Sequence, residues 1–285
     1  MKFILLGEDN MFTGFDLELE LVPEADAELA ELGKKMFSDI KTKVEKELNE
    51  FLESDGSIDG CRLQNSWFPL IEADIFISHS HNDYEEAFKL AGFLNQTFGL
   101  KVFLDSCVWG SADALLKKID DEYCLNPSGS TYCYEDRNYS TSHVHMMLSA
   151  AINSMIDKCE CLFFLNTPNS ISTKDVIDKK TNSPWIYSEI VTSQLIRKKN
   201  PSRMIKKALF EHQDPSMETK DQLNITYDLD TRHLQTLNFD NLKDWKNEYE
   251  KLTSSYETIN RYDMSLIHPL DVLYKQKKLA KVPCF

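Results

Sequence analysis

The stretch Ala73-Asp74-Ile75-Phe76-Ile77-Ser78-His79-Ser80-His81-Asn82-Asp83 decides the fold class of this chain. Its first half is a compact apolar run, which predicts a short buried strand. Its second half is polar and predicts a loop at the end of that strand. A helix should follow directly, because Asn82 or Asp83 can cap its start and Gly99 can end it in a left-handed conformation.

The same alternation of strand and helix continues along the chain. Further strands are predicted at 101–105 and 161–166, with two weaker candidates at 207–211 and 224–229. Further helices are predicted at 112–119, 143–158 and 240–258, and Ser183-Pro184 opens another helix by the rule of a cap followed by proline. Strands that alternate with helices predict an α/β protein with a doubly wound parallel sheet.

The first 70 residues have a different pattern and are predicted to form an N-terminal extension. Phe15, Leu17, Leu19 and Leu21 alternate as in a half-buried strand, and apolar residues then recur at steps of three and four from Leu29 to Leu52. This amphipathic helix is expected to pack on its own domain. The predicted organisation is an extension at 1–70, an α/β domain at 71–235 and a helical segment at 236–285 that packs on that domain.

Composition and charge exclude several classes of function. The chain has 285 residues, of which 42% are hydrophobic, and its 32 Lys and Arg against 46 Asp and Glu give a net charge of −14. Such a charge opposes binding to nucleic acid and to anionic membranes. No apolar run is long enough for a membrane span, and the run Phe3–Leu6 is too short for a secretion signal, so we expect a cytoplasmic protein.

Metal binding is not expected from the cysteines and histidines. The seven Cys are odd in number and lack a framework spacing, which indicates reduced thiols. His143-x-His145 and Cys159-x-Cys161 offer zinc-like ligand types, but their spacing differs from that of the usual zinc sites. These four residues are more simply explained as parts of a helix and of a helix–strand junction.

A candidate site is predicted where the parallel strands end. Ligands of open α/β sheets bind outside the carboxyl ends of the strands. The loops at 78–83 and 105–111 follow two of the predicted strands, and Trp185 and Glu189 lie on the helix after a third. Three segments should therefore converge on one cleft.

Three segments carry a resemblance to a known family. Asp74-Ile75-Phe76-Ile77-Ser78-His79-Ser80, Gly99-Leu100-Lys101-Val102-Phe103-Leu104-Asp105 and Ser183-Pro184-Trp185-Ile186-Tyr187-Ser188-Glu189 resemble a TIR (Toll/interleukin-1 receptor) domain in order and spacing. The resemblance covers about 73–235. It implies a flavodoxin-like doubly wound sheet, and it implies cleavage of the nicotinamide glycosidic bond of NAD, which is then a substrate rather than a cofactor.

The resemblance assigns the catalytic role to Glu189, because Trp185-x-x-x-Glu189 matches the pattern of the enzymatic members. The chemistry agrees with this. Nicotinamide leaves as a neutral base, so no general acid is needed, and one carboxylate can stabilise the oxocarbenium-like ribose. Trp185 lies one turn before Glu189 on the same helix face and is expected to stack on the nicotinamide ring.

Further substrate-binding residues are expected in the two loops. The helix start after Ser80 offers amide groups to the diphosphate, with hydrogen bonds added by Ser78, His79, Ser80 and Asp83. Asp105 and Trp109 resemble substrate- or assembly-contacting positions of the family's BB loop. This loop departs from many family members because it has no central proline.

The resemblance leaves the biological role open between two classes. As an enzyme, the chain is similar to the stand-alone TIR component of Thoeris anti-phage systems, and it would make ADP-ribose, a cyclic isomer or a conjugate that signals to a separate effector. As a scaffold, it would act only through TIR–TIR self-association. A receiver or a nucleoside deoxyribosyltransferase is a third possibility, although a receiver needs paired acids where this chain has Ser78-His79-Ser80.

Overall fold

The computed structural model describes residues 12–18, 27–41, 48–104, 107, 109, 112–171, 179–196, 198, 201, 227–259 and 267–279. Of residues 38–41 and 255–259 only the backbone is described. The predicted strand at 207–211 and the position of Asp105 lie outside the described residues. No helix in the described ranges is both long and apolar enough to cross a membrane.

Short strands and longer helices alternate along most of the chain. The strands are β1 (Thr13–Glu18), β2 (Ile75–Ser78), β3 (Val102–Phe103), β4 (Cys161–Leu165), β5 (Lys180–Thr181), β6 (Tyr227–Asp228) and β7 (Gln235–Asn238). The helices are α1 (Ala27–Lys41), α2 (Gly60–Trp67), α3 (Tyr84–Phe98), α5 (Ala112–Tyr123), α6 (Tyr134–Lys158), α7 (Pro184–Leu195), α8 (Phe239–Ile259) and α9 (Pro269–Gln276). Two short 3₁₀ turns, η2 (Leu48–Phe51) and η3 (His81–Asp83), complete the set.

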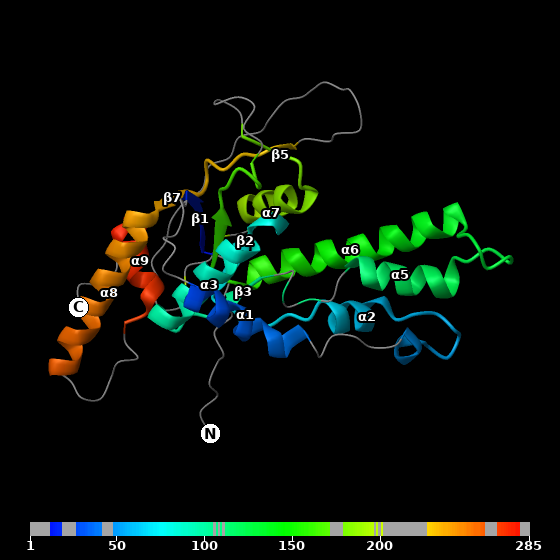
Figure 1. The fold of residues 1–285 in the computed structure, drawn as a ribbon, viewed down its shortest axis with the longest axis horizontal. Coiled ribbons are helices and arrows are strands. Elements are labelled where there is room, and N and C mark those ends of the chain that lie inside the picture. The colour runs from blue at the N-terminus through cyan, green and yellow to red at the C-terminus, as the bar shows by residue number, and fades with distance from the viewer. Residues whose placement is uncertain are drawn as a thin grey trace.

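Five strands form one parallel sheet in the order β3-β2-β4-β1-β7 (Figure 1). Every pair in it is parallel, and the register places Ser78, Phe164, Asp16 and Thr236 in one row across four strands. β5 and β6 pair antiparallel as a separate two-stranded sheet. The predicted α/β class with a parallel sheet is confirmed.

The central strands are the most apolar segments of the chain. All of β2 and all of β4 are buried, as expected for strands that helices cover on both faces. The edge strand β7 reads Gln-Thr-Leu-Asn, of which only Leu237 is buried. Because only one of its four side chains is apolar, this strand has no alternating pattern by which it could be predicted from the sequence.

The position of the first strand differs from the prediction of an N-terminal extension outside the α/β domain. β1 lies inside the main sheet, hydrogen-bonded to β4 on one side and to β7 on the other (Figure 1). The fourth and fifth strands are therefore β1 and β7. The predicted strand at 224–229 corresponds to β6, which pairs with β5 outside that sheet. A period-two pattern identifies a strand but not the neighbours with which it pairs.

Helices cover both faces of the sheet. On one face, Phe15 packs against Tyr274 of α9, and Phe163 packs against Trp245 of α8, which in turn stacks on Phe98 of α3. The other face carries α7, with α6 beside it. This two-sided cover gives the sheet its long cluster of buried aromatic and aliphatic side chains.

The N-terminal helix α1 packs closely on α3. A Cβ atom on Gly33 would lie 2.2 Å from the carbonyl oxygen of Phe88, and one on Gly92 would lie 2.1 Å from that of Leu29. Both distances are far below van der Waals contact, so the two glycines allow the helix backbones to approach each other. The predicted amphipathic helix is confirmed over 27–41.

Helices α5 and α6 extend away from the sheet as an arm, with α2 alongside (Figure 1). The hairpin between them is closed by a bridge from Leu125 to Tyr132. The prediction that the second helix starts near His143 was wrong, since α6 begins at Tyr134. Its first turns are exposed and polar on most sides, so they have no apolar stripe by which a sequence pattern is recognised.

Candidate functional site

The centre of the candidate site is a hydrogen bond between β2 and α7. The hydroxyl of Ser78 donates to Oε2 of Glu189 over 2.6 Å, and both side chains are buried, with relative exposures of 1% and 3%. Ser78 is the last residue of β2, at the carboxyl end of the sheet. The structure therefore brings together the predicted catalytic residue and one predicted substrate-binding residue.

The sequence around α7 explains why Glu189 points at the sheet. The hydroxyl of Ser183 accepts a hydrogen bond from the amide of Ile186, and Pro184 occupies the first position of the helix. The buried residues of α7 fall on one stripe, formed by Ile186, Glu189, Ile190 and Ser193. Glu189 thus occupies a position that would suit an apolar side chain, and its carboxylate needs a partner there.

Asp83 joins the loops that follow β2 and β4. Its carboxylate accepts from the hydroxyl of Thr167 over 2.6 Å and from Nδ2 of the Asn169 side chain over 2.7 Å. Of the two residues predicted to cap the next helix, Asn82 and Asp83, it is Asp83 that stands at the N-cap position of α3, although its side chain makes no capping hydrogen bond. Its carboxylate is committed to fixing the two loops against each other.

His79 and Ser80 are placed at the same edge of the sheet. The ring of His79 is buried, with Nδ1 3.3 Å from the carbonyl oxygen of Ile77, and its edge meets the ring of Tyr84. Ser80 is half-buried, and its hydroxyl accepts from the amide of Asn82 at the start of η3. Both side chains therefore serve the local turn in this structure.

Trp185 is half-buried at the start of α7, one turn before Glu189. Its ring meets the ring of His145 on α6 in an edge-to-face contact, with centroids 5.8 Å apart. His145 therefore contacts the residue predicted to stack on the nicotinamide ring. Sequence reasoning had weighed His145 as a zinc ligand and preferred to explain it as part of a helix, without assigning it to this site.

Trp109 does not join this group. It is 3% exposed, its indole nitrogen donates to the carbonyl oxygen of Pro69, and its ring packs against Phe68 and Phe103. These contacts make it a core residue beside the edge strand β3. Asp105, the other residue predicted in this loop, lies outside the described residues.

A second polar group lies on the same sheet face and was not predicted. Oδ2 of Asp16, on β1, accepts from the ammonium of Lys179 over 2.7 Å, and the same ammonium donates to the hydroxyl of Thr231 over 3.1 Å. Asp16 is 4% exposed. Its sequence signal was a charged residue at an inward position of an apolar strand, Gly-Phe-Asp-Leu.

Ser193 and His233 connect α7 to the segment before β7. The hydroxyl of Ser193 donates to the carbonyl oxygen of Ile190 over 2.8 Å, so it accepts from Nε2 of His233, 2.9 Å away. Burial, with a smaller contribution from the positive charge of Lys198, lowers the pKa of His233 to about 4. This imidazole is therefore neutral at physiological pH.

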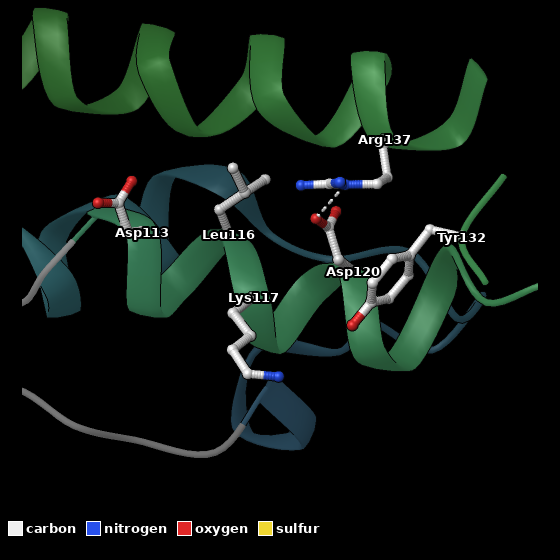
Figure 2. Close-up of a pocket in the computed structure, with 6 residues that line it drawn as sticks. All are labelled: Asp113, Leu116, Lys117, Asp120, Tyr132 and Arg137. Atoms are coloured by element: carbon white, nitrogen blue, oxygen red, sulfur yellow. Dashed lines mark hydrogen bonds and ion pairs between the residues drawn. The ribbon is translucent and has the colours of Figure 1, made fainter. Parts of the chain in front are cut away.

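Two surface hollows lie away from this edge. One, of about 350 Å³, lies between α5 and α6 on the arm, where Asp120 accepts from Arg137 (Figure 2). Asp120 also accepts from the hydroxyl of Ser140. Arg137 also lies over the ring of Tyr132. The buried carboxylate and the guanidinium thus satisfy each other. The second hollow, of about 470 Å³, lies along α1 at Glu31 to Lys35 and is lined by exposed and half-exposed side chains.

Metal-ligating side chains do not gather in the part of the chain that the structure describes. Within these ranges, no three His, Cys, Asp or Glu residues are placed to hold one ion. Cys161 is fully buried at the start of β4, where burial raises the pKa of its thiol well above the usual value. A high thiol pKa disfavours the thiolate that a metal ligand requires.

The arrangement as a whole offers two buried carboxylates at one end of a parallel sheet. Such groups can accept hydrogen bonds from ligand hydroxyls and can stabilise a positive charge that develops nearby. Ser193, the serine that contacts His233, is fully buried within α7. Comparison of the chain with protein-family models, with curated proteins and with solved structures found no match.

Proposed function

We propose that this chain is a TIR-type enzyme that cleaves NAD and releases nicotinamide, with Glu189 as its catalytic residue. The observation that carries the proposal is the buried Glu189 carboxylate held by Ser78 at the carboxyl end of β2. Burying a carboxylate costs free energy unless the fold or the function retains it. A carboxylate kept at the ligand-binding edge of a parallel sheet is best explained by chemistry at that edge.

The strand order supports the proposed fold family. Flavodoxin-like sheets have the order 2-1-3-4-5, and their ligands bind where the order reverses, between the first and third strands. Here β3-β2-β4 reproduces the first three places, whereas β1, the first strand of the chain, takes the fourth, so the order departs from the flavodoxin-like one beyond the reversal. Ser78 ends the strand at the reversal, next to β4.

The proposed reaction breaks the bond between C1′ of the ribose and the nicotinamide nitrogen. The bonding electron pair goes to the nicotinamide ring, which becomes neutral, and positive charge develops on the ribose. Glu189, held by Ser78, stabilises that charge, while Trp185 stacks on the departing ring. Water then adds to C1′ and gives up a proton, which yields ADP-ribose; attack by the adenine or by another nucleophile instead yields a cyclic isomer or a conjugate.

The context that we propose is a cytoplasmic immune signal in anti-phage defence. The product would act on a separate effector, as in Thoeris systems, and the enzyme would self-associate through TIR–TIR contacts. The alternative is a scaffold that uses only such self-association. The observation that favours a scaffold is the burial of Glu189, which also suits a carboxylate with a purely structural role.

The first test compares Glu189→Gln with the unchanged chain. Purified protein at several concentrations is incubated with NAD, and nicotinamide and the adenine-containing products are separated by chromatography and identified by mass. We expect nicotinamide release to fall on the order of 100- to 1,000-fold, as when one electrostatic stabiliser is removed from an active site. The variant keeps an acceptor for Ser78, so it should still fold.

Glu248→Gln on the exposed side of α8 is the matched control, because it makes the same chemical change away from the site. It should release nicotinamide at the rate of the unchanged chain. The result would support the scaffold function over the enzymatic one if neither protein releases nicotinamide at any concentration while both self-associate as judged by light scattering. Equal release by the unchanged chain and by Glu189→Gln would instead remove Glu189 from the catalytic role.

A further inference from the structure

Asp16 and the Ser78–Glu189 pair lie on one face of the sheet, in a row that Phe164 of β4 interrupts; we call this row the polar strip. The register places Ser78, Phe164 and Asp16 side by side in one row, so Ser78 and Asp16 point to the same face with one strand between them. Neighbouring strands lie about 4.8 Å apart, so the two Cα atoms are roughly 10 Å apart. This spacing is comparable to the diphosphate bridge between the two riboses of a dinucleotide.

Helix α7 links the two ends of the strip. Glu189 and Ser193 are one turn apart on its buried side, and they contact Ser78 and His233 respectively. Two residues before His233, Thr231 accepts from Lys179, which holds Asp16. The two polar ends of the strip, on β2 and β1, are thus connected through α7 and the segment before β7, while β4 places Phe164 between them.

Asp16 has an unused hydrogen-bonding atom in this strip. Its Oδ2 receives Lys179, whereas Oδ1 is buried and has no hydrogen-bond partner among the residues that the structure describes. A carboxylate accepts hydrogen bonds and, when ionised, donates none, so a ligand that satisfies Oδ1 must bring donors. Lys179 is 40% exposed and lies over this carboxylate, so a movement of its flexible side chain opens a route from solvent.

We propose that Asp16 binds the 2′- and 3′-hydroxyls of the adenosine ribose of a dinucleotide, while Glu189 acts on the other ribose. The proposal rests on the proposed function, because it identifies the second half of the same substrate. Acidic side chains at the ends of parallel strands commonly accept ribose hydroxyls, and they disfavour a phosphate at the 2′ position. Lys179, which contacts Asp16, supplies the positive charge that a chain of net charge −14 needs for the diphosphate.

The test uses NAD, NADP and the NAD analogue that lacks the adenosine 2′-hydroxyl, each with the full-length chain. We expect kcat/KM for both analogues to be at least about tenfold below that for NAD, because one analogue loses a hydrogen bond to a charged group and the other places a phosphate against Asp16. Asp16→Asn should lower kcat/KM for NAD about tenfold and leave that for NADP nearly unchanged, so the preference for NAD disappears.

Asp228→Asn is the matched control, since Asp228 is an exposed acid on β6, 3.7 Å from Lys180. It should keep the preference for NAD. If Asp16→Asn does not fold, the substrate series on the unchanged chain still decides: equal kcat/KM for NAD and both analogues overturns the proposal. An unchanged ratio of NAD to NADP in a folded Asp16→Asn protein overturns it as well.

A failure of the proposed function gives a different result, namely no cleavage of any of the three compounds. Calorimetry then measures binding of ADP-ribose and of its adenosine 2′-phosphate derivative, which requires no turnover. Binding of ADP-ribose that is weakened by the 2′-phosphate and by Asp16→Asn supports the adenosine-ribose site. Absence of ADP-ribose binding, or binding that neither change affects, overturns it.

Discussion

His233 is a histidine whose burial in the folded chain disfavours its charged, protonated form. Its Nε2 donates to Ser193, and its Nδ1 is buried without a hydrogen-bond partner in the described part of the chain. Protonation would place a charge in this position, and this is why burial lowers the pKa to about 4. The group is therefore a local source of acid sensitivity next to the candidate site.

The sign of the pH dependence follows from the two pKa values of His233. The folded value of about 4 lies below the ordinary 6.5, so between these values the unfolded chain binds more protons than the folded one. Stability should fall as the pH decreases from about 6.5 to about 4, by on the order of 2 kcal/mol from this residue. Urea unfolding at a series of pH values measures it.

His233→Gln provides the comparison for this prediction. The Gln amide nitrogen can still donate to Ser193, but the side chain does not titrate in this range. The loss of stability between pH 6.5 and pH 4 should therefore be smaller in the variant than in the unchanged chain. The same slope in both proteins would show that His233 is not responsible.

Site residues could be predicted in part from the sequence. Ser78 was identified from its place at the end of a strand and Glu189 from the resemblance of Trp185-x-x-x-Glu189 to a family pattern, although the two residues are 111 positions apart in the chain. Asp16 was not, because its role depends on β1 lying next to β4. Trp109 was assigned to the site from its loop, but its apolar neighbours Phe68 and Phe103 draw the ring into the core.

The contact between α1 and α3 depends on the absence of two side chains. Gly33 and Gly92 each face a backbone carbonyl of the other helix at about 2 Å from where a Cβ would stand. Backbone atoms cannot move aside as a flexible side chain can. A methyl group at either position must therefore push the helices apart.

Gly92→Ala should destabilise the chain by about 1–3 kcal/mol. This is the net loss, because the steric cost of the methyl group should exceed the roughly 1 kcal/mol by which alanine is favoured over glycine in a helix. Thermal or urea unfolding measures the difference. Gly60→Ala is the control, because its Cβ would meet only the end of the Met147 side chain, at 3.4 Å. A Gly92→Ala protein as stable as the Gly60→Ala control would contradict the close approach of the helices.

Burial determined which strands and helices could be predicted from the sequence. β2 and β4 were placed almost to the residue, because their continuous apolar runs are bounded by polar loops. β7 and the first turns of α6 were missed, because exposed or edge segments carry little apolar pattern. The predicted α7 is confirmed, and its Ser183-Pro184 start acts as expected.

The whole sheet requires its N-terminal strand. Without β1, β4 and β7 would lose their common neighbour, and the backbone groups along both would be left without partners. We therefore expect residues 71–285 alone to be largely unfolded, in contrast to the full chain. Far-UV circular dichroism and urea unfolding of both proteins test this.

A cooperative unfolding transition in 71–285, similar to that of the full chain, would contradict this expectation and support an independent domain at 71–235. The pattern of residues 1–70 could not decide this question. Strand pairing between distant segments is set by the global packing of the chain, which local periodicity does not encode.

The central place of β1 also reverses the usual order of events during synthesis. Proteins commonly fold from the N-terminus as they leave the ribosome. Here β1 pairs with Cys161–Leu165 and with Gln235–Asn238, so it cannot have both neighbours until the segment up to Asn238 has been translated. Until then at least one edge of β1 lacks its partner, and an unpaired strand edge is a site for wrong pairing with other chains.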